Sequence, residues 1–125
     1  MPLVFERDDE RRRITVTLSG PLMLAEFTAN LDRLAAEGVW GYAVLYDGHR
    51  ATAPLSVEAT RHLVQVVREL TAQHGPRGPV ALVMANEVLS ETARIYSTLA
   101  EGTGLRSEVF HDFAAAEAWL ASFSS

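Results

Sequence analysis

The sequence of 125 residues contains no cysteine and no lysine. Without cysteine, the chain cannot form disulfides, thiol nucleophiles or thiolate metal sites. Without lysine, Schiff-base chemistry and a phosphate-loop lysine are also excluded, because all 11 basic residues are arginine. Several classes of enzyme are therefore removed before any motif is considered.

The sequence also lacks the run of roughly 20 apolar residues that a membrane-spanning helix needs, and it does not open with a secretory signal pattern. We therefore expect no membrane insertion and a cytoplasmic location. A net charge of −5 disfavours nucleic-acid binding, which depends on clustered cations. The basic run 11–13 directly follows the acidic run 8–10, and we interpret both as a solvated turn.

Motifs of specific chemistry are absent as well. The four histidines, His49, His62, His74 and His111, do not have the spacing of a metal site. The sequence has no Gly-x-Ser-x-Gly nucleophile motif, and its Gly-Thr-Gly follows a predicted helix, the wrong context for a phosphate loop. We predict no metal, no cofactor and no catalytic residue, which makes an enzyme the less favoured reading.

The periodicity of apolar residues predicts a single α/β domain over residues 1–125. Strands are expected at 3–7, 13–19, 40–46, 79–85 and 105–111, and helices at about 24–37, 56–74, 87–101 and from 113 onward. The alternation indicates a mostly parallel sheet of about five strands with an antiparallel N-terminal edge, covered by four helices. The last helix is expected to bury Phe113, Ala116, Trp119, Leu120 and Phe123.

Three segments carry a likeness to a known family: 18–22 (Leu-Ser-Gly-Pro-Leu), 44–47 (Val-Leu-Tyr-Asp), and 109–113 (Val-Phe-His-Asp-Phe) followed by 116–120. With this order of elements, nearly the whole chain resembles the STAS domain, the fold of bacterial anti-sigma-factor antagonists. The closing segment is most similar to a STAS-like branch described as related to the lipid-binding CRAL-TRIO fold. The resemblance implies a STAS-like protein-interaction or ligand-binding module.

In STAS antagonists a Ser or Thr at the start of the second helix is phosphorylated, within an Asp-Ser-Ser-Gly-Leu-like motif. The present sequence reads Ala-Thr-Ala-Pro-Leu-Ser at 51–56. Thr52 and Ser56 supply hydroxyls there, but the motif itself is missing, so the phosphorylation switch is in doubt. Ser56 is also a good N-cap for the helix, with Glu58 in its first turn.

Asp47, His49 and Arg50 lie close together in the sequence at the predicted end of the third strand, where ligands of α/β proteins gather. An acid, an imidazole and a guanidinium could bind an anion or polarise a water as a group. The alternative is three solvated side chains, with Asp47 accepting hydrogen bonds from the amides of its own loop.

Trp40 and Tyr42 share one face of the predicted third strand with Val44 and Tyr46, while small residues occupy the other face. Helices cover this aromatic face in one reading. In the other, Trp40 and Tyr42 form an interface with a second copy of the chain or with an apolar ligand. We expect a homodimer.

These observations favour a non-enzymatic interaction or small-ligand-binding regulatory module. One alternative is a small hydrolase or transferase that uses Asp47, His49 and Arg50. The other is a carrier of a lipid or other apolar ligand. The expected partner is a protein or a small anionic or apolar ligand.

Overall fold

The computed structural model describes residues 3–123. The strands are β1 (Val4–Asp8), β2 (Arg13–Pro21), β3 (Ala43–Ala53), β4 (Val80–Met84) and β5 (Ser107–Phe110). The helices are α1 (Leu24–Ala36), α2 (Val57–His74), α3 (Glu87–Ala100) and α4 (Phe113–Ala121), and the short 3-10 helix η1 (Glu101–Thr103) follows α3.

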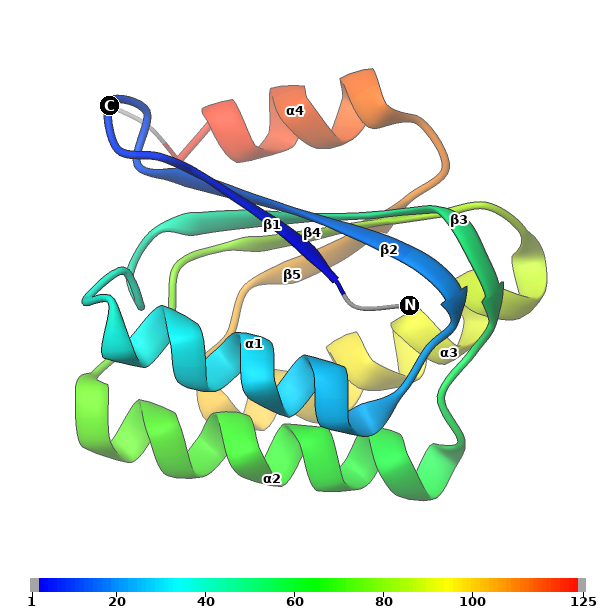
Figure 1. The fold of residues 1–125 in the computed structure, drawn as a ribbon, viewed down its shortest axis with the longest axis horizontal. Helices are drawn as coiled ribbons and strands as arrows, with labels where there is room; N and C mark the ends of the chain where they lie inside the picture. The colour runs from blue at the N-terminus through cyan, green and yellow to red at the C-terminus, as the bar shows by residue number, and fades with distance from the viewer. Residues whose placement is uncertain (1–2, 124–125) are drawn as a thin grey trace.

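The five strands form one sheet in the order β1-β2-β3-β4-β5. β1 pairs antiparallel with β2, and the remaining pairs are parallel. The predicted fold class is therefore confirmed, including the antiparallel N-terminal edge. Each parallel strand is followed by a helix that runs back to the end of the sheet where the parallel strands begin (Figure 1).

The helices divide unequally between the two faces of the sheet. Helices α1, α2 and α3 lie on one face, and α4 lies alone on the other (Figure 1). The larger apolar cluster, under α1–α3, includes Val44, Tyr46 and Leu82; the smaller cluster, under α4, is built around Leu45, Ala81 and Val83. β4 is buried at every position, as its continuous apolar sequence predicts.

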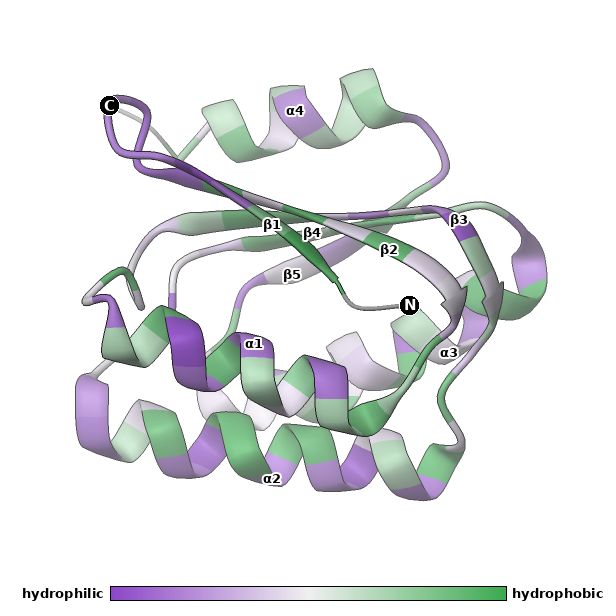
Figure 2. Cartoon of the chain, in the orientation of Figure 1, coloured by the Kyte–Doolittle hydropathy of each residue, from purple (hydrophilic) through white to green (hydrophobic). Residues whose placement is uncertain are grey.

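Helix ends follow the sequence signals. Ser56, Asn86 and Asp112 each cap a helix, with a side-chain oxygen that accepts from a backbone amide of the first turn. Gly38 has φ of 73° just beyond α1, the left-handed conformation that glycine adopts most readily. Along α1 and α2, hydrophilic and hydrophobic residues alternate in bands (Figure 2), as expected for helices with one buried face.

The third strand is longer and later than predicted. It begins at Ala43 rather than Trp40, and it continues through Asp47 and Gly48 to Ala53. The pairing with β2 shifts register twice in this extension, between Thr17 and Ser19 and again after Gly20, which marks bulges. β2 and β3 bend together at this end (Figure 1). The residues Asp-Gly-His at 47–49 predict a loop, but bulged, bent strands carry the same residue types as turns.

The buried face of α4 was only partly predicted. Ala116 and Leu120 are buried against the sheet, but Phe113 and Phe123 are 40% and 36% exposed. The Trp119 ring lies between those of Phe110 and Phe123, at centroid distances of 5.8 and 4.8 Å. Within residues 3–123, no second helix lies beside α4 on this face, so Phe113 and Phe123 stay partly open to solvent.

Candidate functional site

The predicted junction brings only two of its residues together. Asp47 accepts hydrogen bonds from the backbone amide of His49, at 3.1 Å, and from its Nδ1, at 2.8 Å. This is the local turn in which the Asp47 carboxylate binds the chain two residues on. Within residues 3–123, no hydrogen bond or ion pair joins Arg50 to either of them.

Thr52 and Ser56 are both exposed at the same edge of the sheet. Thr52 lies on the extended part of β3, whereas the Ser56 hydroxyl accepts from Ala59 N at 3.0 Å as the N-cap of α2. The two hydroxyls are therefore held by different elements. Both stay candidate positions for binding or phosphorylation, without the sequence motif of the STAS phosphorylation switch.

Trp40 and Tyr42 lie before β3 rather than within it. Trp40 is 5% exposed, and its indole N–H donates to the carbonyl of Gly75 at 2.8 Å. Tyr42 is half-buried, and its hydroxyl donates to Asp9 at 2.8 Å. Trp40 thus belongs to the core and leaves Tyr42 as the larger contributor to the surface.

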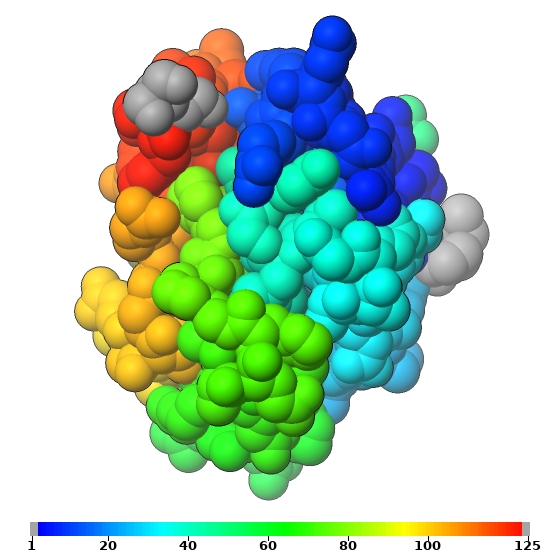
Figure 3. Space-filling view, turned by 90° about the vertical axis from the view of Figure 1, so that its left-hand side faces the viewer, coloured from blue at the N-terminus to red at the C-terminus, as the bar shows by residue number. Residues whose placement is uncertain are grey.

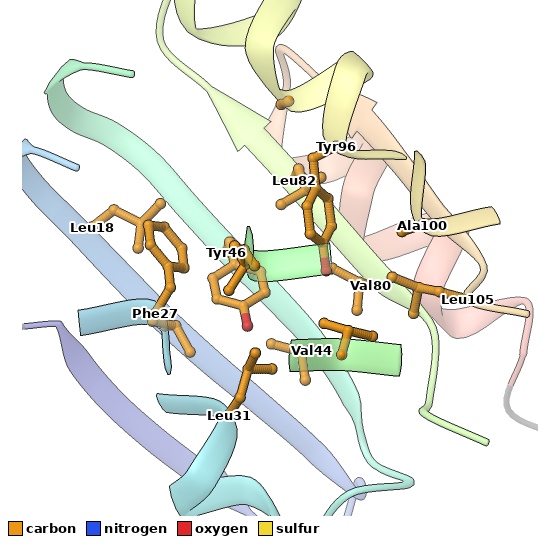
Figure 4. Close-up of a cluster of buried hydrophobic side chains, with 14 of the residues drawn as sticks. Leu18, Phe27, Leu31, Val44, Tyr46, Val80, Leu82, Tyr96, Ala100 and Leu105 are labelled. Carbon is orange, nitrogen blue, oxygen red and sulfur yellow. The ribbon is translucent and has the colours of Figure 1, made fainter. Parts of the chain in front are cut away.

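A cavity of about 60 Å³ lies between the sheet and helices α1, α2 and α3. Its walls are mostly aliphatic and aromatic, with Leu31 from α1, Leu63 from α2 and Leu82 from β4. Two half-buried lining residues lie just past the ends of strands: Leu22 directly follows β2, and Leu55 is the second residue after β3. The cavity therefore reaches toward the surface at the carboxyl ends of these strands. Figure 4 shows the side chains of this region, with Tyr46 between Phe27 and Tyr96.

Arg77 is the charged residue in the cavity wall. It is 4% exposed, and its guanidinium donates to the hydroxyl of Tyr46 at 2.9 Å and to that of Tyr96 at 3.4 Å. It also lies 5.6 Å from the centre of the Trp40 ring, within cation–π range. Burial raises the pKa of the Tyr96 phenol, so this hydroxyl is neutral near pH 7.

The loop between α2 and β4 fixes the position of Arg77. It reads Gly-Pro-Arg-Gly-Pro over residues 75–79, so a proline precedes Arg77 and a second follows Gly78. A Cβ on Gly78 would overlap the carbonyl oxygens of Gly41 and Tyr42, and the Gly78 amide donates to the carbonyl of Trp40 at 3.3 Å. Only glycine allows the loop to approach the 40–42 segment this closely. Figure 3 shows this end of the molecule, where the end of α2 lies next to the segment before β3, and that segment lies next to the charged turn of residues 8–13.

The sequence did not identify Arg77 as a site residue. Its local signal is an arginine enclosed by prolines and glycine immediately before a strand with no polar residue. Such a position is held near the sheet, and the side chain has few routes to solvent. The distant partners Tyr46 and Tyr96, which lie 31 and 19 residues away, become visible only in the fold.

No protein-family model and no curated protein matches the chain. Among solved structures, the chain is similar to an uncharacterised DUF3478-family protein with a SpoIIAA-like fold from Shewanella loihica PV-4. The identity is 19% and the TM-score 0.59, over 94% of this chain and 91% of that protein. The chain has a SpoIIAA-like fold. At this identity the likeness concerns the fold alone, and it agrees with the STAS resemblance found in the sequence.

Two further observations concern the described part of the chain. No helix within residues 3–123 has both the length and the apolar character needed to cross a membrane. In the same range, no three His, Asp or Glu side chains are grouped so that they could hold a metal ion.

Proposed function

We propose that this STAS-like chain is a non-enzymatic regulatory module that binds a small, largely apolar ligand between the sheet and helices α1–α3. The observation that carries the proposal is the cavity of about 60 Å³ with its aliphatic and aromatic walls. Ligand sites are concave and mostly apolar, with few polar groups to orient the ligand. At about 60 Å³ this cavity is smaller than most such sites, so its ligand has to be short or to extend through the opening near Leu22 and Leu55.

The apolar walls of the cavity support this function. Protein interiors are close-packed, so apolar side chains that line an unfilled space lack contacts that a bound apolar group would supply. A ligand that fills the space also removes the apolar walls from water, which favours its binding.

The test uses 1-hexanol as an uncharged apolar probe, titrated into the ¹⁵N-labelled protein and followed by NMR chemical shifts. Ala93 lines the cavity from α3, so Ala93→Phe fills the space, whereas Ile95→Phe on the same helix changes an exposed position. We expect saturable binding by the wild type and Ile95→Phe, with shifts at residues around Tyr46 and Tyr96, and at least tenfold weaker binding by Ala93→Phe. Wild-type protein that gives no saturable shifts, or an Ala93→Phe variant that binds as the wild type does, would contradict the proposal.

Binding of a protein partner at the start of α2 is a second candidate function. It is favoured by the position of Leu55, which lines the cavity and directly precedes Ser56, the exposed N-cap of α2. A ligand at Leu55 therefore lies one residue from a surface that also holds Arg50 and Thr52. The test is partner capture from the parent cells, in which the Arg50→Ala and Ser56→Asp variants should show weaker or altered binding compared with the wild type. Identical capture by all three proteins would mean that this edge is only a connector.

A further inference from the structure

The Arg77 guanidinium is buried without a negative charge to compensate it. Within residues 3–123, no Asp or Glu forms an ion pair with Arg77, and its two hydrogen-bond partners are neutral tyrosine hydroxyls. The other buried arginine, Arg13, is by contrast paired with Glu117 at 3.0 Å. Arginine remains charged at any physiological pH, and an isolated buried charge is strongly unfavourable.

The hydrogen bonds around Arg77 also leave donors in excess. A guanidinium has five N–H donors; two are used by the tyrosines, and the buried Nε has no partner. The Tyr46 hydroxyl oxygen already accepts from Asn30 and from Arg77, both at 2.9 Å. With the Asn30 amide in this orientation the Tyr46 oxygen is used twice as an acceptor, and the buried Oδ1 of Asn30 has no donor. The Tyr96 hydroxyl accepts from Arg77, and within residues 3–123 it donates to no acceptor.

We propose that the cavity ligand is an apolar monocarboxylate whose carboxylate binds Arg77 between the Tyr46 and Tyr96 hydroxyls, with its apolar tail directed toward Leu22 and Leu55. The inference rests on the proposed ligand-binding function and specifies the class of ligand. A carboxylate supplies one negative charge and two acceptor oxygens, which match the planar fork of arginine.

Other occupants fit these residues less well. A buried water would satisfy hydrogen bonds but would leave the guanidinium charge uncompensated. A phosphate dianion would bring two negative charges to a single cation, within walls that are otherwise aliphatic and aromatic. A neutral apolar molecule would leave both the charge and the free donors as they are. A monocarboxylate with an apolar tail matches the charge, the donors and the walls together.

The test compares hexanoate with 1-hexanol, which share their tail and differ in the head group, by NMR titration at pH 7. We expect the wild type to bind hexanoate at least tenfold more tightly than 1-hexanol. Arg77→Met should lose this preference while 1-hexanol still binds, and Arg77→Lys should keep part of it. Arg61→Met, which removes an exposed cation from α2, is the control for net charge and should behave as the wild type.

The outcomes separate the two proposals. If neither compound binds, the proposed function and the ligand class both fail. If 1-hexanol binds at the cavity but hexanoate binds no more tightly, or if Arg77→Met keeps the preference for hexanoate, only the monocarboxylate proposal is overturned.

A measurement on the wild type decides the orientation even if Arg77→Met does not fold. Nuclear Overhauser contacts should join the hexanoate protons next to the carboxylate to the rings of Tyr46 and Tyr96, and the terminal methyl group to Leu22 or Leu55. The reverse orientation, with the methyl group at the tyrosines, would overturn the proposed placement of the carboxylate.

Discussion

At the scale of single residues, the two buried arginines provide a comparison of paired and unpaired charge. Arg13 and Arg77 are 5% and 4% exposed, but only Arg13 has a carboxylate partner, Glu117. Replacing Arg13 removes the closer of two arginines that pair with Glu117, the other being Arg11 at 3.2 Å, whereas replacing an unpaired buried charge by an apolar side chain removes a cost. The same kind of substitution should therefore have opposite effects at these two positions.

We predict that Arg77→Met leaves the ligand-free protein as stable as the wild type or up to about 2 kcal/mol more stable, because the desolvation cost of the guanidinium disappears. Arg13→Met should instead destabilise it by about 1–3 kcal/mol, since Glu117 then loses its bond to Arg13. Urea unfolding of the three proteins measures both effects. A large loss of stability in Arg77→Met would mean that Arg77 serves mainly to hold the fold.

The two tyrosines next to Arg77 should also differ. Tyr46 accepts two hydrogen bonds of 2.9 Å, from Asn30 and Arg77, and both donors are buried. The bond from Arg77 to Tyr96 is 3.4 Å, beyond the usual range for N–H···O bonds. Tyr46→Phe should cost about 1–3 kcal/mol, since two buried donors lose their acceptor, and Tyr96→Phe less than about 1 kcal/mol. Thermal unfolding measures the difference; equal losses would contradict this reading of the geometry.

At the scale of elements, the loop between α2 and β4 determines where Arg77 lies. Gly78 is the tight point, because a Cβ there would overlap the backbone of Gly41 and Tyr42. Gly78→Ala should therefore destabilise the protein by about 1–3 kcal/mol and weaken hexanoate binding by moving Arg77. Gly41→Ala is the matched control in the facing segment, since its Cβ would meet no atom within 4 Å. Similar unfolding midpoints for the two variants would contradict the predicted close approach.

The elements also show what the sequence could predict. Apolar periodicity and capping residues located four helices and five strands, because each signal is local: Ser56, Asn86 and Asp112 bind the first turns that follow them. The sequence does not predict the extension of β3 past Asp47, because its pairing depends on residues of β2 that lie 31 or 32 positions earlier in the chain. The exposure of Phe113 depends equally on tertiary structure, since in the described range 3–123 no second helix adjoins α4 on its face of the sheet.

The candidate site was harder to predict than the fold for the same reason. Asp47, His49 and Arg50 attract attention because they are neighbours in sequence, yet only Asp47 and His49 are in contact. Arg77 and its two tyrosines come from the loop before β4, from β3 and from α3. No spacing rule joins residues from three elements, so their grouping follows from packing alone.

At the scale of the whole molecule, the uneven distribution of helices separates two surfaces. The cavity lies between the sheet and helices α1–α3. On the opposite side, where α4 lies, Phe110, Trp119 and Phe123 form an aromatic row. The predicted homodimer concerns a third region, the segment before β3. Because Trp40 is 5% exposed there, a substitution of Trp40 would act on the core, and only Tyr42 can test the interface directly.

We predict that the protein is a dimer at micromolar concentration in both 0.15 M and 1 M salt, because apolar burial is not screened as ion pairs are. Light scattering coupled to size exclusion measures the mass under each condition. Tyr42→Glu should dissociate the dimer, since it places a charge in the predicted contact, whereas Phe113→Glu, on the exposed side of α4, should leave it intact. A monomeric wild type would contradict the homodimer itself. A dimer that withstands Tyr42→Glu but dissociates in Phe113→Glu would show that the copies meet through α4 and not through Tyr42.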